Sequence, residues 1–220
     1  MGAYEGLTKF FPCGLCDLAA KLKYRGDNIC ILSGDIEELQ RSFPETYDNL
    51  MSCGHNKDKR TPIRYAQDVV ASWLFEDYLV AKFRDLGRKL ELAGGDRERK
   101  LLPHSRVSSS SDCIYVCNGK RLKVEIMNSY TTFWKTKQCL HLRDHKYAQL
   151  CKENGVLLCV DAQNSSFAII DFTKEPPPAK YIPSHMHYGG KPAYELSLSS
   201  VPFYDFKAQS IIDNLDALMK

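Results

Sequence analysis

Residues 113–127 read CIYVCNGKRLKVEIM, and this stretch decides the fold. Residues 113–117 are apolar and favour a β-strand, and residues 121–126 alternate between charged and apolar side chains. Asn118 and Gly119 stand between the two runs. This dipeptide is typical of a two-residue hairpin turn because both residues readily adopt positive φ. The stretch therefore predicts an antiparallel β-hairpin.

The segments on both sides of the hairpin predict further helices and strands. Before it, apolar residues at three- and four-residue steps predict a helix over 62–87, followed by a short strand at 89–92 and a loop. After it we expect a polar aromatic segment (128–136), an amphipathic helix (137–153), strands at 156–160 and 167–172, an irregular region (179–206) and a closing helix (206–219). The predicted fold class is α/β, with a mixed β-sheet flanked by helices.

Composition limits the class of protein. The chain has 220 residues, 44% hydrophobic and 26% charged, which excludes a disordered or collagen-like chain. No apolar run approaches the length of a membrane span, and the first residues lack an export signal, so we expect a cytoplasmic protein without a membrane partner. The formal net charge is +3, but residues 119–152 hold eight Lys or Arg and two acids. We expect a polyanion to bind there.

The cysteines suggest a small module ahead of the main domain. Four of the nine cysteines lie in residues 1–60, which look turn-rich, and we predict a zinc-binding module there, followed by a domain of residues 61–220. An odd number of cysteines without an export signal argues against a disulfide framework. Two close pairs suit a structural tetrahedral zinc site: Cys13 with Cys16, and Cys53 with His55. Cys30 is an alternative fourth ligand, and buried thiols with a surface histidine are the alternative to a site.

Two acidic residues are placed for a metal ion by the hairpin. Asp112 opens its first strand and Glu125 lies near the end of its second strand. Folding the strands against each other brings both acids to the same end of the sheet. Carboxylate oxygens are the ligands that Mg²⁺ prefers, although acids at such positions are also common without an ion.

Together these residues resemble the PD-(D/E)xK nuclease superfamily, which forms the core of most type II restriction endonucleases. The resemblance covers about residues 62–172, half of the chain. It consists of a leading helix with Glu76, the acid Asp112 at the start of a strand, the strand with Glu125, and the helix and two strands that follow. It implies a restriction endonuclease-like core in which Asp112 and Glu125 hold the catalytic Mg²⁺. For Glu76 the stronger interpretation is an ordinary charge on the polar face of an amphipathic helix.

One position departs from the family. The family has a lysine two residues after the glutamate, where it polarises the attacking water, but this chain has Met127. Three explanations are open. The chain is an inactive form in which methionine replaces lysine, the role has moved to another lysine, or a retained fold has lost its activity. The lysines considered for a moved role are Lys135, Lys137 and Lys146.

Side chains suited to nucleic acid follow Glu125. Cations for phosphates combine with amides and aromatic rings in a polar stretch, although a solvated helix is also charged. The candidate contacts are Asn128, Tyr130, Lys135, Lys137, Arg143 and Lys146, with Arg97 and Arg99 in the loop before the hairpin. The resemblance implies a homodimer acting on double-stranded DNA.

The sequence thus predicts a type II restriction endonuclease-like enzyme that hydrolyses phosphodiester bonds in double-stranded DNA at specific sequences. Its predicted cofactors are a catalytic Mg²⁺ and a structural Zn²⁺. The alternative is a non-catalytic, zinc-stabilised DNA-binding or regulatory module that keeps the nuclease fold, and Met127 favours this alternative.

Overall fold

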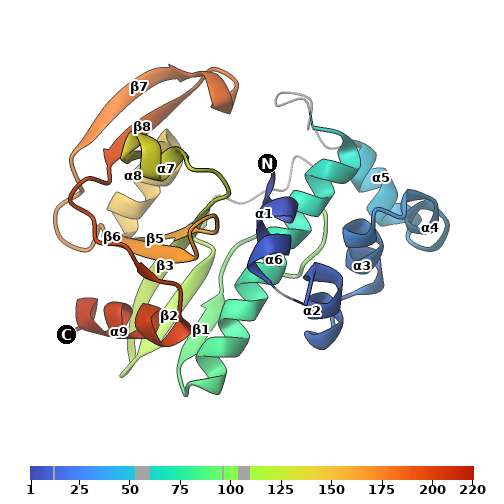
Figure 1. Cartoon of the computed structure of the whole chain (residues 1–220), viewed down its shortest axis with the longest axis horizontal. Helices are drawn as coiled ribbons and strands as arrows, with labels where there is room; N and C mark the ends of the chain where they lie inside the picture. Colours follow the sequence, from blue (N-terminus) through green and yellow to red (C-terminus); the bar gives the residue numbers. More distant parts are fainter. Residues whose placement is uncertain (12, 53–59, 96, 104–109) are drawn as a thin grey trace. The chain divides into compact units, whose positions relative to one another are not determined.

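A computed structural model of the chain describes residues 1–11, 13–52, 60–95, 97–103 and 110–220. The chain divides into two compact units (Figure 1). Unit 1 comprises Met1–Tyr78 and Gly95–Ser108, and unit 2 comprises Leu79–Gly94 and Ser109–Lys220. Helix α6 (Pro62–Asp85) confirms the first predicted helix. Its residues are shared between the units, so the division differs from the predicted boundary at residue 60.

Unit 1 is helical. Its first five helices have seven to nine residues each: α1 (Ala3–Phe10), α2 (Leu15–Lys21), α3 (Gly26–Ser33), α4 (Ile36–Ser42) and α5 (Pro44–Ser52). Helices this short are marginal alone, so burial of their apolar residues stabilises them. Leu7, Ile31 and Leu39 are fully buried. The expectation of turn-rich structure is corrected: short helices surround an apolar core in this unit.

Unit 2 contains the predicted mixed sheet. Its six strands follow the order β1-β2-β3-β5-β6-β9, in which β3 and β5 are parallel and the other neighbours antiparallel. The strands are β1 (Lys89–Leu92), β2 (Cys113–Cys117), β3 (Lys120–Ser129), β5 (Val156–Asp161), β6 (Ser166–Asp171) and β9 (Tyr204–Asp205). The hairpin β2–β3 is confirmed, with φ of 49° at Asn118 and 76° at Gly119.

A second, antiparallel sheet was not expected. It has the order β4-β8-β7, with β4 (Cys139–Arg143), β7 (Ala179–His185) and β8 (Lys191–Ser197). The single helix predicted at 137–153 is wrong, because α7 (Phe133–Lys137) and α8 (Asp144–Glu153) flank β4. The prediction of an irregular region at 179–206 is also wrong, since β7 and β8 lie there with a 3₁₀ turn between them, η3 (Met186–Tyr188).

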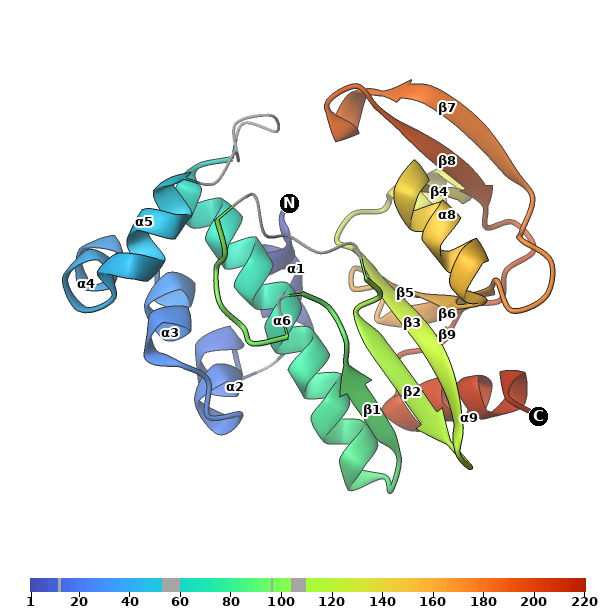
Figure 2. The same cartoon turned by 180° about the vertical axis from the view of Figure 1, so that it is seen from behind.

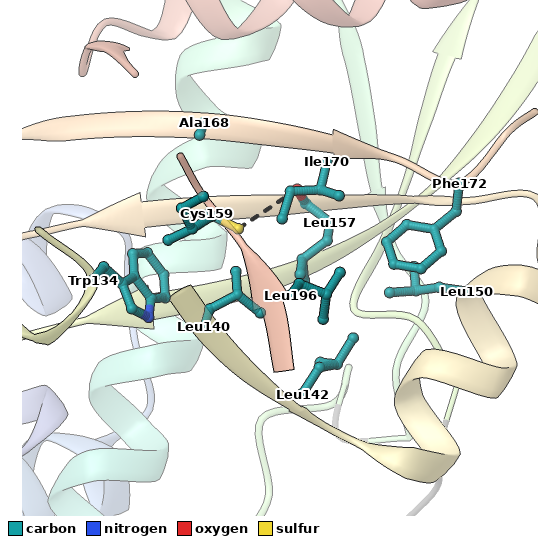
Figure 3. Close-up of a cluster of buried hydrophobic side chains, with 11 residues drawn as sticks. Trp134, Leu140, Leu142, Leu150, Leu157, Cys159, Ala168, Ile170, Phe172 and Leu196 are labelled. Atoms are coloured by element: carbon teal, nitrogen blue, oxygen red, sulfur yellow. Dashed lines mark hydrogen bonds between the residues drawn. The ribbon is translucent and has the colours of Figure 1, made fainter. Parts of the chain in front are cut away.

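The two sheets of unit 2 pack through a common apolar cluster, shown in Figure 3. Leu140 on β4 and Leu196 on β8 face Leu157 and Cys159 on β5, and Leu150 adds a side chain from α8. Helix α9 (Ala208–Leu218) lies on the opposite face of the large sheet from α8 (Figure 2). None of the helices within the described ranges combines the length and apolar character that a membrane span requires.

Candidate active site

Asp112 and Glu125 come together across the hairpin. The register pairs Cys113 with Val124, so Asp112, just before β2, lies opposite Glu125 on β3. The Ile126 backbone N–H donates a hydrogen bond of 2.8 Å to Oδ2 of Asp112, and Ala93 N–H donates to the Asp112 carbonyl at 2.9 Å. Backbone bonds from β3 to its side chain and from the residue after β1 to its main chain therefore hold Asp112 in place. Glu125 is buried, with 7% of its surface exposed.

Helix α8 supplies a lysine to this pair. The ammonium of Lys146 lies 2.7 Å from Oε1 of Glu125 and donates to the carbonyl of Ser110 at 3.4 Å. Both side chains of the ion pair are largely buried. Because α8 begins at Asp144, directly after β4, its first turn carries Lys146 to the Glu125 carboxylate. Two acids and one lysine are thus assembled from β2, β3 and α8.

The electrostatics of Glu125 follow from this position. The pKa of Glu125 is raised to about 7, chiefly by burial and then by the negative charge of Asp112, and Lys146 opposes both effects. A third acid, Glu153, lies at the end of α8 and accepts hydrogen bonds from Ser111 Oγ at 2.8 Å and Lys123 Nζ at 3.3 Å. A buried carboxylate with a strongly raised pKa beside a second carboxylate is typical of functional sites.

Asp112 and Glu125 offer carboxylate oxygens, the kind of ligand that Mg²⁺ takes in proteins. Among the described residues, neither Asp112 nor Glu125 belongs to a set of three acid, histidine or cysteine ligand atoms that all lie within 4.8 Å of one another. Mg²⁺ demands octahedral geometry but keeps several waters, and one or two protein carboxylates are enough to hold it. The charge of Asp112 acts on Glu125, and a divalent cation bound by both carboxylates would neutralise them.

Met127 lies on the same face of β3 as Glu125, two residues further along the strand. It is half-buried and packs against the apolar cluster between the two sheets. Its thioether is therefore part of the core of unit 2, and it has no proton to exchange with a water molecule.

The sequence predicted Glu76 as a catalytic residue and Arg99 as a nucleic-acid contact, but the two side chains form an ion pair with each other. In unit 1, Nη1 of Arg99 lies 2.8 Å from Oε2 of Glu76, and its Nη2 lies 2.9 Å from Oδ1 of Asp77. Arg99 is 7% exposed and Glu76 is 9% exposed. Because each is buried as the other's partner, we exclude both from the candidate site. Arg97 is exposed on the same loop.

The remaining candidate contacts for nucleic acid lie in unit 2. Lys135 and Lys137 are exposed on α7, and the guanidinium of Arg143 lies 5.2 Å from the ring centre of Tyr188. Asn128 and Tyr130 are half-buried at the end of β3. Lys146 is the candidate contact that lies at the acidic pair, through its ion pair with Glu125.

The predicted zinc site is only partly visible. Cys53 and His55 lie outside the described residues. Cys13 is half-buried, and Sγ of Cys16 lies 3.9 Å from Oγ of Ser33. Within the described ranges, Cys13, Cys16 and Cys30 do not form a set of three ligand atoms within 4.8 Å of one another. The zinc module therefore stays a prediction.

A further set of metal-binding side chains was not predicted from the sequence. Cys139, His141 and Glu195 bring their ligand atoms within 4.8 Å of one another on β4 and β8. The available signal was the spacing Cys139-x-His141, which puts both side chains on one face of a strand but on different sides of a helix. The predicted helix over 137–153 hid this signal.

Comparison with known proteins adds no family: no protein-family model matches the chain, and no curated protein matches it either.

Proposed function

We propose that the chain is an Mg²⁺-dependent nuclease that hydrolyses phosphodiester bonds, with Asp112, Glu125 and Lys146 as its active site. The observation that carries the proposal is the 2.7 Å contact between Lys146 Nζ and Glu125 Oε1, beside Asp112. The order of elements supports it. Helix α6, the antiparallel strands β1–β3, helix α8 and strand β5, which is parallel to β3, occur in the order that the resemblance to PD-(D/E)xK nucleases implies, with α7 and β4 inserted between β3 and α8.

Each residue of the proposed site has a chemical role. Asp112 and Glu125 would hold Mg²⁺, which lowers the pKa of a bound water and neutralises charge on the scissile phosphate. The hydrogen bond from Ile126 N–H orients the Asp112 carboxylate for this role. Lys146 places a fixed positive charge where negative charge develops during attack on the phosphate, and preorganised charges of this kind lower the barrier.

The position of Lys146 bears on the departure at Met127. Of the three explanations for the methionine, the geometry favours a role that has moved to another lysine. Lys146 reaches the Glu125 carboxylate from α8, whereas Lys135 and Lys137 are exposed on α7. We therefore propose that Lys146 takes the part that a lysine at position 127 plays in the family.

The proposed substrate is double-stranded DNA. Exposed cations follow the proposed site along the chain on α7 and at the end of β4, where they suit the phosphates of a duplex. A homodimer cutting at a specific sequence in the cytoplasm belongs to the same proposal, because two sites related by a twofold axis meet the two antiparallel strands of a palindrome.

A second candidate function is a non-catalytic DNA-binding or regulatory module. The observation that favours it is Met127, which packs into the apolar cluster as a core residue. In that case the Lys146–Glu125 ion pair has a structural role.

Incubation of a plasmid with the purified protein separates the two functions. We expect discrete fragments with Mg²⁺ and none with EDTA, and loss of cleavage in Asp112→Asn and Lys146→Ala. The matched controls are Asp85→Asn, which changes an exposed acid, and Lys152→Ala, which changes an exposed lysine of α8. Salt-sensitive binding without any cleavage by the unaltered protein would overturn the nuclease proposal and support the binding module.

A further inference from the structure

The outer face of the small sheet gathers three metal-binding groups. The register of β4 and β8 pairs His141 with Glu195, and Cys139 lies two residues before His141 on the same face. Nε2 of His141 lies 3.1 Å from Oε2 of Glu195, and Sγ of Cys139 lies 3.9 Å from the same oxygen. Leu140 and Leu142, which alternate with them, point into the apolar cluster. The three groups thus face away from the core.

These separations fit zinc. With Zn–S of about 2.3 Å and Zn–N and Zn–O of about 2.0–2.1 Å, tetrahedral ligand atoms lie roughly 3.3–3.6 Å apart. The two observed separations, 3.1 and 3.9 Å, lie on either side of this range. A thiolate, an imidazole and a carboxylate are the three kinds of side chain that bind Zn²⁺ in proteins. Small rotations of the side chains would bring all three onto one ion.

A second histidine fixes the orientation of the first. Nε2 of His185 lies 2.8 Å from Nδ1 of His141, so the nitrogen of His141 that faces away from Glu195 already has a partner. His185 is buried, with 7% of its surface exposed. The ring of Phe133 lies 5.4 Å from that of His141, centre to centre. Ligating histidines are typically held in this way by a hydrogen bond to the second ring nitrogen.

The three groups also open onto a pocket of about 820 Å³. Its wall includes Phe133, Lys137 and Lys180 as well as Cys139, His141 and Glu195. A zinc ion held by three protein groups keeps one coordination position for water or another ligand. The open side of the cluster offers that position, and the two lysines favour an anion there.

We propose that Cys139, His141 and Glu195 bind one Zn²⁺, with the fourth position open to the pocket and His185 as the positioning residue for His141. The site is separate from the acidic pair of the proposed nuclease, and it does not depend on that function. It is also separate from the zinc site predicted with Cys13 and Cys16.

The test is the binding of Zn²⁺ and Co²⁺ to the full chain. We use a Cys13→Ser/Cys16→Ser background, because it removes two ligands of the other predicted zinc site. We expect one equivalent of zinc by elemental analysis after dialysis, and a thiolate-to-cobalt absorption band on titration with Co²⁺. Cys139→Ser in this background should lose both. Cys117→Ser, which removes a half-buried thiol of β2, should keep both.

A variant that weakens zinc binding without removing a ligand distinguishes a loss of metal binding from a loss of folding. His185→Phe keeps an aromatic ring but removes the hydrogen bond to His141, and we expect zinc affinity to fall by about 10- to 100-fold with the cobalt band retained. If the Cys13→Ser/Cys16→Ser background does not fold, the loss of one zinc equivalent from the unaltered chain on Cys139→Ser is the same test. No zinc and no cobalt band in folded protein, or a band that survives Cys139→Ser, would overturn the proposal.

Discussion

Lys146 on α8 and Glu125 on β3 form a buried ion pair, with 2.7 Å between Nζ and Oε1. This contact joins the helix to the strand that carries both the acid and Met127. The burial of Glu125 and its proximity to Asp112 would be costly without a positive charge, and the only such charge within salt-bridge distance of Glu125 in the described ranges comes from α8. The pair therefore connects the stability of unit 2 to the chemistry that we propose for it.

Removal of the lysine tests its role directly. We expect Lys146→Ala to lower the rate of plasmid cleavage by about 10²- to 10⁴-fold, the range that a positioned catalytic side chain typically contributes. DNA affinity in a gel shift should change only a few-fold, because one cation among many contacts the duplex. Lys152→Ala, on the same helix, should cleave at the unaltered rate. Unaltered cleavage by folded Lys146→Ala would exclude the lysine from the mechanism.

A lysine at position 127 distinguishes a moved role from a lost one. Met127 packs against the apolar cluster, so Met127→Lys should lower the free energy of unfolding by about 1–3 kcal/mol. If Lys146 has the catalytic role, cleavage should not increase. Urea denaturation and plasmid cleavage measure the two effects, and Met127→Leu is the control that keeps an apolar side chain. A clear gain of activity in Met127→Lys would instead show that the methionine replaces a catalytic lysine.

The raised pKa of Glu125 predicts a pH dependence of stability. In the folded chain the pKa of the Glu125 carboxyl is about 7, whereas its ordinary value is 4.5. Between these values the folded state binds more protons than the unfolded state, so its stability falls as the pH rises. Relative to Glu125→Gln, the unaltered protein should lose about 3 kcal/mol between pH 4 and pH 8, since one pKa unit corresponds to about 1.4 kcal/mol.

Urea denaturation of both proteins across this pH range measures the difference. Added Mg²⁺ at pH 8 should stabilise the unaltered protein more than Glu125→Gln, because a ligand that binds only the folded state stabilises it. A pH-independent difference between the two proteins would contradict the predicted titration of Glu125.

Local sequence signals predicted the elements near the proposed active site. The turn at Asn118 and Gly119 fixes the register of its hairpin by backbone geometry alone, and that register places Asp112 opposite Glu125. The long helix α6 was equally clear because its apolar residues repeat at helical spacing. These features depend on neighbours in the sequence, so one sequence is enough to predict them.

The small sheet depends on contacts that local patterns do not contain. In residues 139–143 the alternation of Leu140 and Leu142 is the strand signal, but it is short and precedes the true helix α8, so the two segments were merged. Along β7 the exposed and buried residues do not alternate, and its pairing with β8 decides its structure. The cluster at His141 and Glu195 could not be predicted without that pairing.

Arg99 and Arg97 lie on one loop, and we expect their substitution to have opposite effects on stability and on DNA binding. Arg99 is buried between Glu76 and Asp77, whereas Arg97, two residues before it, is exposed. Arg99→Met would remove the guanidinium that contacts both Glu76 and Asp77 in unit 1, and breaking a buried ion pair in this way typically costs about 3–5 kcal/mol. Arg97→Met should change the free energy of unfolding by less than about 0.5 kcal/mol, as most exposed substitutions do.

Urea denaturation measures both stabilities, and a gel shift on the folded variants measures DNA affinity. We expect Arg99→Met to be destabilised but to bind DNA normally at a temperature where it is folded, because its guanidinium is turned to the protein. Arg97→Met should keep its stability, and a reduced affinity would place this loop at the duplex. Weaker binding by a fully folded Arg99→Met would instead mean that Arg99 leaves its two carboxylates to contact DNA.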